Sequence, residues 1–136
     1  MIATAPALIV WKDSYSVRIP KIDAQHKILI DLTNQLHGAM LTGKAQEALA
    51  KILNDLVSYT DTHFAYEESL LISRRYSGLA THQQQHRALV GQVRELSEKF
   101  RGGRLTLSIE TLQFLKNWLT SHILSSDQAY ARELGV

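Results

Sequence analysis

The sequence contains no cysteine, and this absence excludes several kinds of site at once. Disulfide frameworks, thiolate zinc sites, cysteine-ligated iron–sulfur clusters and cysteine nucleophiles all require a residue that these 136 positions lack. Any metal bound by this chain must therefore be held by nitrogen and oxygen atoms. The length suits one domain, which can bury a hydrophobic core without covalent cross-links.

Excess charge of one sign and long apolar runs are also scarce. Lys and Arg outnumber Asp and Glu by only 15 to 13, and the densest basic cluster, residues 99–104, falls at an expected turn. No positively charged stripe that could bind nucleic acid follows a helix. The apolar residues 1–10 have no basic flank, contain Pro6 and are too short to cross a bilayer. We therefore expect a cytoplasmic protein whose partners include neither nucleic acid nor a membrane.

Proline occurs only at positions 6 and 20, before the first long periodic stretch. Residues 1–20 are therefore expected to form an irregular N-terminal arm, and residues 21–136 a single domain. After the arm, apolar or histidine residues recur at a spacing of three or four, which is typical of helices that bury one stripe. The pattern predicts four helices, near residues 22–40, 45–70, 79–100 and 105–122.

Glycines at positions 43, 78, 102 and 103 mark the three junctions between these segments. Junctions this short force neighbouring helices to run antiparallel, so the sequence predicts an all-α protein, an up-down-up-down four-helix bundle. For the start of the third helix there are two candidate capping residues: Thr81, with Gln84 three residues later, and Ser77.

Five of the six histidines are predicted to meet at one level of the bundle. They lie near the start of the first helix, the end of the second, the start of the third and the end of the fourth: His26, His63, His82, His86 and His122. A single buried histidine is usually a structural residue that hydrogen-bonds a carbonyl group. Five neutral imidazoles packed together would leave several donors and acceptors unpaired, at ~1–3 kcal/mol each, whereas a metal would use their lone pairs.

Two carboxylates share this level. Glu67 follows His63 by four residues and therefore lies on the same helix face. Asp127 follows His122 by five residues, which would point its side chain about 140° away on a regular helix. The helix must therefore end, kink or contain a π-bulge near Ser125 and Ser126 for Asp127 to face inward.

Seven such donors exceed what one tetrahedral zinc needs and would suit two metals bridged by both carboxylates. Imidazole and carboxylate suit iron, manganese or zinc, so the donor types alone do not choose the metal. The sequence has no Glu-x-x-His, so the ferritin-like di-iron pattern is absent, and no His-Glu-x-x-His of the helical zinc proteases.

The order and spacing of these donors resemble the ligand signature of the hemerythrins. The resemblance rests on His26, His63-Phe-Ala-Tyr-Glu67, His82-Gln-Gln-Gln-His86 and His122-Ile-Leu-Ser-Ser-Asp127. It extends from Trp11 to Tyr130. It implies a cofactor of two non-heme iron ions, bridged by carboxylates and by an oxo or hydroxo group, with dioxygen as the ligand. One iron would be held by His82, His86 and His122 and the other by His26 and His63, with Glu67 and Asp127 bridging them.

Four side chains are candidates to line the dioxygen pocket: Leu29, Phe64, Trp118 and Leu119. None can donate a proton except, weakly, the tryptophan indole, which favours binding over turnover. For each of them plain core packing is the alternative, and least so for Leu119, which lies one turn from His122.

Residues around the donors have less certain assignments. Asp23 either accepts the second ring proton of a ligand histidine or stabilises the first turn of its helix. Tyr130 either reaches the site or lies at the edge of the bundle, and the same alternatives hold for Tyr59 and Tyr66. His37 is ~16 Å along the helix from His26 and is assigned to the edge.

The sequence thus favours reversible dioxygen binding for storage, delivery or sensing, and no enzymatic activity. Three alternatives stay open: a di-iron redox enzyme that acts as a peroxidase, a scavenger of nitric oxide or dioxygen, or a ferroxidase; an oxygen- or redox-dependent signalling module; and a helical interaction module without metal. A redox partner protein and a monomer or weak homo-oligomer are compatible with the favoured function.

Overall fold

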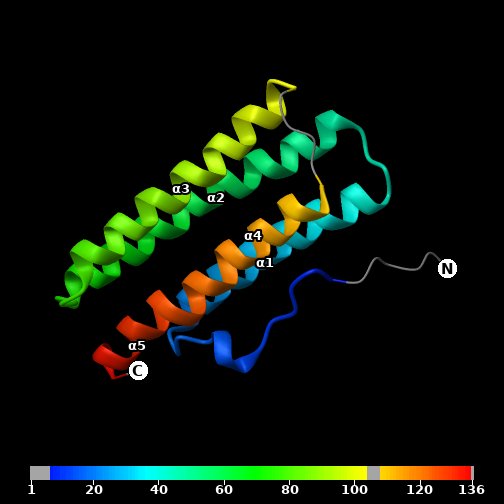
Figure 1. Ribbon diagram of the computed structural model, residues 1–136. Coiled ribbons are helices and arrows are strands. Elements are labelled where there is room, and N and C mark those ends of the chain that lie inside the picture. Colours follow the sequence, from blue (N-terminus) through cyan, green and yellow to red (C-terminus); the bar gives the residue numbers. More distant parts are fainter. Residues whose placement is uncertain (1–6, 104–107, 136) are drawn as a thin grey trace.

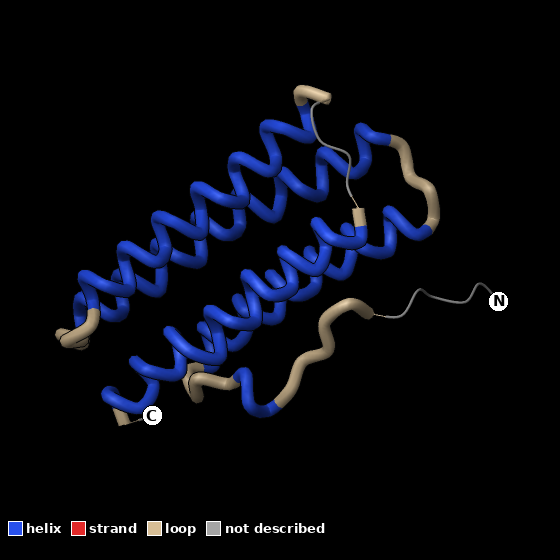
Figure 2. The backbone as a smooth tube through the Cα atoms, in the orientation of Figure 1, coloured by secondary structure: helices blue, strands red, loops and turns tan. Residues whose placement is uncertain are grey.

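The computed structural model describes residues 7–103 and 108–135 and is an antiparallel four-helix bundle (Figure 1). The long helices are α1 (Pro20–Leu41), α2 (Gln46–Ser73), α3 (Leu79–Arg101) and α4 (Ile109–His122). The last of them continues through a π-helical segment, η2 (Ile123–Asp127), into α5 (Gln128–Leu134). Within these described ranges there is no strand (Figure 2). The fold predicted from the periodicity is confirmed.

Local sequence explains several of the helix ends. Pro20 occupies the first turn of α1, where a missing N–H costs nothing, so the helix begins at the last residue of the expected arm. The α1–α2 and α3–α4 turns pass through Gly43 at φ +68° and Gly103 at φ +73°, a backbone region that favours glycine. The Ser108 hydroxyl accepts a hydrogen bond from the Thr111 N–H at 3.2 Å and caps α4.

The predicted cap of the third helix is wrong. Helix α3 begins after Gly78 without a side-chain cap, and Thr81 lies inside its first turn. The other candidate, Ser77, donates its backbone N–H to Glu133 Oε2 at 2.9 Å, and its hydroxyl also bonds the same carboxylate. Ser77 therefore ties the α2–α3 turn to α5 instead of capping α3.

The N-terminal arm packs along the bundle and contributes to its core. Asn34 of α1 accepts a hydrogen bond from the Ile9 N–H at 2.9 Å and donates one to the Ile9 carbonyl at 2.8 Å. Ile9, Tyr15 and Val17 are buried, and a short 3-10 turn, η1 (Asp13–Tyr15), carries the tyrosine inward. Residues 1–6 of the expected arm and Leu105 of the fourth predicted helix lie outside the described residues.

Two apolar clusters divide the interior along the bundle axis. The larger contains Leu29, Leu56, Val93 and Leu119 among others, and the smaller is Val17, Ile22, Leu71, Tyr130 and Ala131. On α1, for example, His26 falls between Ile22 of one cluster and Leu29 of the other, so the polar layer is enclosed by hydrophobic packing on both sides.

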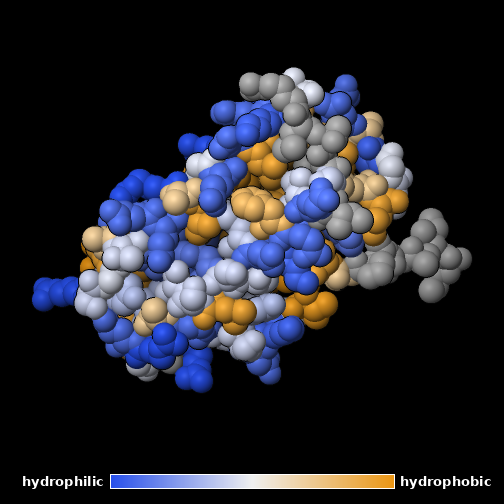
Figure 3. Space-filling view, viewed as in Figure 1, coloured by the Kyte–Doolittle hydropathy of each residue, from blue (hydrophilic) through white to orange (hydrophobic). Residues whose placement is uncertain are grey.

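The surface is mixed. Hydrophilic side chains cover most of the face seen in Figure 3, with hydrophobic patches between them. None of the described helices is both long enough and apolar enough to cross a membrane.

Candidate metal centre

The five predicted histidines lie in the same layer of the bundle. His26 is in the second turn of α1, His63 is in the second half of α2, His82 and His86 are among the first eight residues of α3, and His122 ends α4. Each is at most 6% exposed. His37 is absent from the groups of the described chain that could hold a metal ion.

Two fully buried carboxylates lie between these rings: Glu67 and Asp127. Asp127 is the last residue of η2, and this π-helical segment supplies the change of helical phase that its five-residue spacing from His122 requires. The predicted interruption of the helix is confirmed. On a regular helix the same five-residue spacing would direct the carboxylate about 140° away from His122.

Each oxygen of Glu67 faces a different set of rings. Oε1 lies 2.7 Å from His82 Nε2 and 3.0 Å from His86 Nε2. Oε2 lies 3.4 Å from His63 Nε2 and 3.7 Å from His26 Nε2. The carboxylate therefore presents one oxygen to the histidines of α3 and the other to those of α1 and α2.

Asp127 makes the same division. Its Oδ1 lies 3.1 Å from His122 Nε2 and 3.3 Å from His82 Nε2, and its Oδ2 lies 3.0 Å from His26 Nε2. Two groups that could hold a metal ion result, each with donor atoms within 4.8 Å of one another. The first group comprises Glu67, His82, His86, His122 and Asp127, and the second comprises His26, His63, Glu67 and Asp127.

Most donor atoms in this layer have no hydrogen-bond partner among the described residues. The unpaired atoms include both oxygens of Asp127 and the Nε2 atoms of four histidines: His26, His63, His86 and His122. They lie close to one another but are not aligned as hydrogen bonds. Buried polar atoms left unpaired cost about 1–3 kcal/mol each, so a shared cation is the physical solution that fits this arrangement. Nitrogen and oxygen donors of this kind suit iron.

The electrostatics of the layer also favour a cation. Burial lowers the pKa of His26, but the carboxylates of Asp127 and Glu67 outweigh it and raise that pKa to about 9. For His63, burial prevails and its pKa is lowered. Burial alone would raise the pKa of Glu67, yet four surrounding imidazoles hold it well below its usual range. The carboxylates thus stay ionised and attract positive charge. A metal ion can supply this charge, and without a metal a protonated imidazole does.

A small apolar cavity adjoins the second group of donors. It measures about 10 Å³, close to the smallest space that holds one water-sized molecule. Its wall contains the four predicted pocket residues, two more apolar side chains and three of the histidines: Leu29, Phe64, Trp118, Leu119, Leu89, Ile123, His26, His63 and His122. Sequence reasoning missed Leu89, which reaches the cavity from α3, and Ile123, the first residue of η2.

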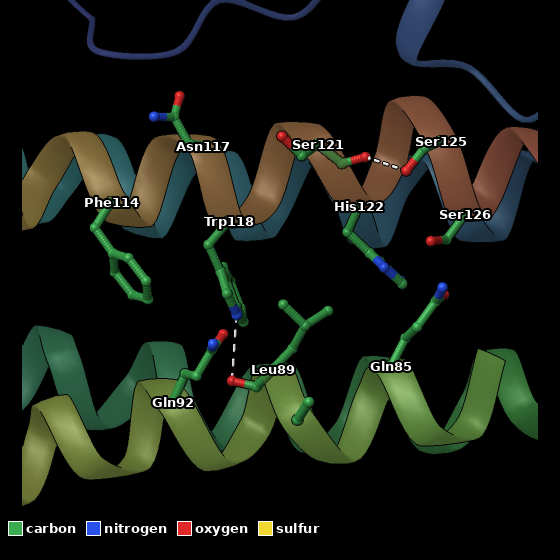
Figure 4. Close-up of a pocket in the computed structure, with 11 residues that line it drawn as sticks. Gln85, Leu89, Gln92, Phe114, Asn117, Trp118, Ser121, His122, Ser125 and Ser126 are labelled. Carbon is green, nitrogen blue, oxygen red and sulfur yellow. Dashed lines mark hydrogen bonds between the residues drawn. The ribbon is translucent and has the colours of Figure 1, made fainter. Parts of the chain in front are cut away.

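Trp118 separates this cavity from the surface. A depression of about 510 Å³ lies between α3 and α4, and Leu89, Trp118 and His122 line both it and the cavity (Figure 4). The Trp118 indole donates its N–H to the Leu89 carbonyl at 3.2 Å, which fixes the ring between the two helices. This bond occupies the one weak proton donor that the sequence offers near the pocket.

Three residues form hydrogen bonds with the metal-donor side chains from outside the donor set. His63 Nδ1 lies 2.6 Å from Gln25 Oε1, and His86 Nδ1 lies 2.7 Å from Glu68 Oε2. The Tyr130 hydroxyl donates to Glu67 Oε2 at 3.1 Å, and burial among the acidic groups raises its pKa, so it keeps its proton.

Sequence reasoning missed Gln25 and Glu68, although each is adjacent to a donor residue in the chain. It left Tyr130 undecided between the site and the bundle edge, and Tyr130 reaches the site. Tyr59 packs against the larger apolar cluster and Tyr66 is 38% exposed.

Asp23 bonds no histidine in the described structure. It accepts the Val17 N–H at 2.9 Å and the Ser16 hydroxyl at 2.5 Å, and so anchors the arm to α1. A carboxylate in a first helical turn is also favoured by the helix dipole.

Comparison with known proteins also supports a cation-binding site in this bundle. Residues 17–134 match the family model described as the hemerythrin HHE cation binding domain. A bacteriohemerythrin from Stenotrophomonas maltophilia is 36% identical over 128 residues, 94% of this chain and 82% of that protein. A myohemerythrin from Riftia pachyptila is 31% identical over 129 residues, 95% of this chain and 96% of that protein.

Solved hemerythrin structures have the same fold as this chain. A crystal structure of wild-type hemerythrin superimposes with a TM-score of 0.88 at 31% sequence identity, covering 96% of this chain and all of the other. A leucine-to-alanine mutant of hemerythrin gives the same TM-score at 30% identity.

Proposed function

Because the chain belongs to the hemerythrin family, we propose that it binds dioxygen reversibly at a centre of two non-heme iron ions. The observation that carries this proposal is the division of two buried carboxylates between two sets of histidines. Each carboxylate gives one oxygen to each set. A single ion would not need this division.

The donor sets assign the residues. His82, His86 and His122 would hold one ion, His26 and His63 the other, and Glu67 and Asp127 would bridge them. Ferrous iron supplies the electrons and the coordination position that reversible dioxygen binding needs. The set with two histidines has one imidazole fewer, and the small cavity lies beside both of its rings. We therefore assign dioxygen to this side.

The cavity wall favours binding without turnover. Apart from the histidine rings it is formed by apolar side chains, and its one N–H donor, on Trp118, is bonded to the Leu89 carbonyl. The Tyr130 hydroxyl is bonded to Glu67 and does not line the cavity. When the imidazoles are bound to metal, a ligand in this space meets no acid that could protonate it, and burial keeps water and reductants away. Oxygen storage, delivery or sensing follows more directly than oxidation chemistry.

Anaerobic iron loading followed by repeated oxygenation tests the proposal. Purified protein is loaded with ferrous iron under argon, its iron content is measured, and its absorption is followed while oxygen is added and removed. We expect two iron ions per chain and a coloured form that disappears when oxygen is removed. Fewer than two ions would contradict the di-iron site, and irreversible oxidation in the first cycle would favour an enzyme.

Glu67→Ala separates the bridging role from a general effect on the helix. This variant should lose the iron pair, because both sets of histidines lose a shared oxygen donor. Glu47→Ala is the matched control, since Glu47 is an exposed glutamate in the first turn of the same helix. If Glu67→Ala kept both ions and normal oxygen spectra, the bridging assignment would be wrong.

A further inference from the structure

The two sets of histidines are supported by different chemical groups. Among the described residues, His63 and His86 are the two of the five rings whose Nδ1 atoms have a hydrogen-bond partner. His63 meets the neutral amide of Gln25, which is 6% exposed, and His86 meets the carboxylate of Glu68. Because Nε2 of each ring would bind a metal ion through its lone pair, Nδ1 carries the proton in the metal-loaded protein and donates it in both bonds.

We propose that Glu68 and Gln25 are positioning residues that make the two metal positions electronically unequal. Glu68 stabilises the higher oxidation state in the position of His86, while Gln25 leaves the position of His63 easier to keep reduced. This inference rests on the proposed di-iron function. It adds the prediction that the position backed by Glu68 is the first to be oxidised.

The chemistry of the outer bond explains the direction. A carboxylate draws the Nδ1 proton towards itself, so the ring becomes a stronger electron donor through Nε2. A ferric ion gains more from that donation than a ferrous ion because its charge is higher. A neutral amide accepts the same proton without adding charge, so its effect on the ring is smaller.

The orientation of the His86 ring is fixed by its neighbour Phe64. Its ring lies parallel to the Phe64 ring, at 3.7 Å between centroids and 2° between planes. The stacked phenyl group fixes the imidazole plane, so that Nε2 faces Glu67 at 3.0 Å while Nδ1 faces Glu68 at 2.7 Å. The ring can therefore transmit a change at Glu68 to the centre without turning.

The surroundings of Glu68 offer a control for charge alone. Its side chain is 26% exposed and lines a surface depression of about 420 Å³ together with Asp61, Arg87 and Arg94. Asp61 is paired with Arg94 and bonds no histidine in the described structure. Asp61→Asn therefore removes a negative charge from the same depression without changing the hydrogen bond to His86.

Potentiometric titration of the iron-loaded protein tests the inference. The absorption of the unmodified protein, Glu68→Gln, Gln25→Glu and Asp61→Asn is followed while one-electron mediators withdraw the two electrons in turn. Glu68→Gln should raise the potential of the first oxidation, and Gln25→Glu should lower that of the second. Each shift should be at least about 59 mV, tenfold in a one-electron equilibrium constant. Glu68→Gln and Gln25→Glu should thus each narrow the difference between the two oxidation potentials, and Asp61→Asn should leave that difference unchanged.

The outcomes are distinguishable from failure of the proposed function. If the unmodified protein takes up fewer than two iron ions, the di-iron proposal itself fails. If it takes up two and cycles with oxygen, but neither variant moves its step, the inference alone is overturned. An equal shift in Asp61→Asn would also overturn it, since the field of a nearby charge would then explain the result. Glutamine and glutamate have nearly equal size, and Gln25→Glu still tests the inference if Glu68→Gln does not fold.

Discussion

Deleting Ser125 should leave Asp127 facing the histidines, whereas inserting one alanine between Ser125 and Ser126 should turn it away. On a regular helix, each residue advances the side-chain direction by about 100°. The natural spacing of five from His122 to Asp127 gives about 140°, and the π-helical turn corrects it. A spacing of four gives about 40°, which lies on the same face without any π-turn.

The magnitudes follow from this geometry. Insertion makes the spacing six, and Asp127 would then point about 120° from His122 on a regular helix. Deletion shifts α5 by at most about 1.5 Å, and Ser125 is exposed, with its hydroxyl bonded only to the Ser121 carbonyl. We expect the deletion variant to keep two metal ions per chain, with affinity within about tenfold of the unmodified protein, and the insertion variant to lose one ion or both.

Metal analysis after dialysis and calorimetric titration with iron or zinc measure this difference, and circular dichroism checks that both variants remain helical. The insertion serves as the matched control for the deletion, because both change the chain by one residue at the same place. If both variants fold but the deletion loses metal as completely as the insertion, the π-turn itself is required and the spacing argument is refuted.

Three further predictions concern the same layer. Protonated His26 is stabilised by its carboxylate neighbours, and this contribution to folding stability is complete below the ordinary pKa of 6.5 and is lost as pH rises to about 9. The Tm of the metal-free protein should therefore fall over this interval, by the equivalent of ~3 kcal/mol at most. A constant Tm would contradict the charge assignment. Tyr130→Phe removes the donor to Glu67 Oε2 and should cost about 1–3 kcal/mol in urea unfolding of the metal-free protein, and an unchanged midpoint would show that the bond contributes nothing. Leu119→Ala should cost about 2–5 kcal/mol and speed the irreversible oxidation of the oxygenated protein, while an unchanged oxidation rate would show that this side chain does not shield the cavity.

The bundle and the convergence of the seven donors follow from simple counting along the chain. Periodicity locates helices, short junctions make them antiparallel, and the distance of each histidine from its helix end gives its height. The spacing of His122 and Asp127 even required an interruption of the helix, and η2 supplies it. Local rules suffice here because they depend on residues of the same helix.

Contacts between helices could not be predicted in this way. Gln25 reaches His63, 38 residues away, and Glu68 reaches His86, 18 residues away, only because of how α1, α2 and α3 are rotated relative to one another. The polar residues next to donor positions were a signal that could have identified both. Asp23, three residues before His26, is polar and near a donor position but bonds the arm, so such proximity alone does not identify a residue that supports the site.

The double hydrogen bond between Asn34 and Ile9 gives the N-terminal segment a register that its own irregular backbone could not define. One amide group does here what a neighbouring strand does in a sheet: it accepts the N–H and donates to the carbonyl of a single residue. Ile9 and Tyr15 are thereby held in the main hydrophobic cluster, so the four helices do not complete their own interior. Packing of residues 9–15 against the bundle therefore completes the exclusion of water from this cluster, and Asn34 fixes the position of that segment.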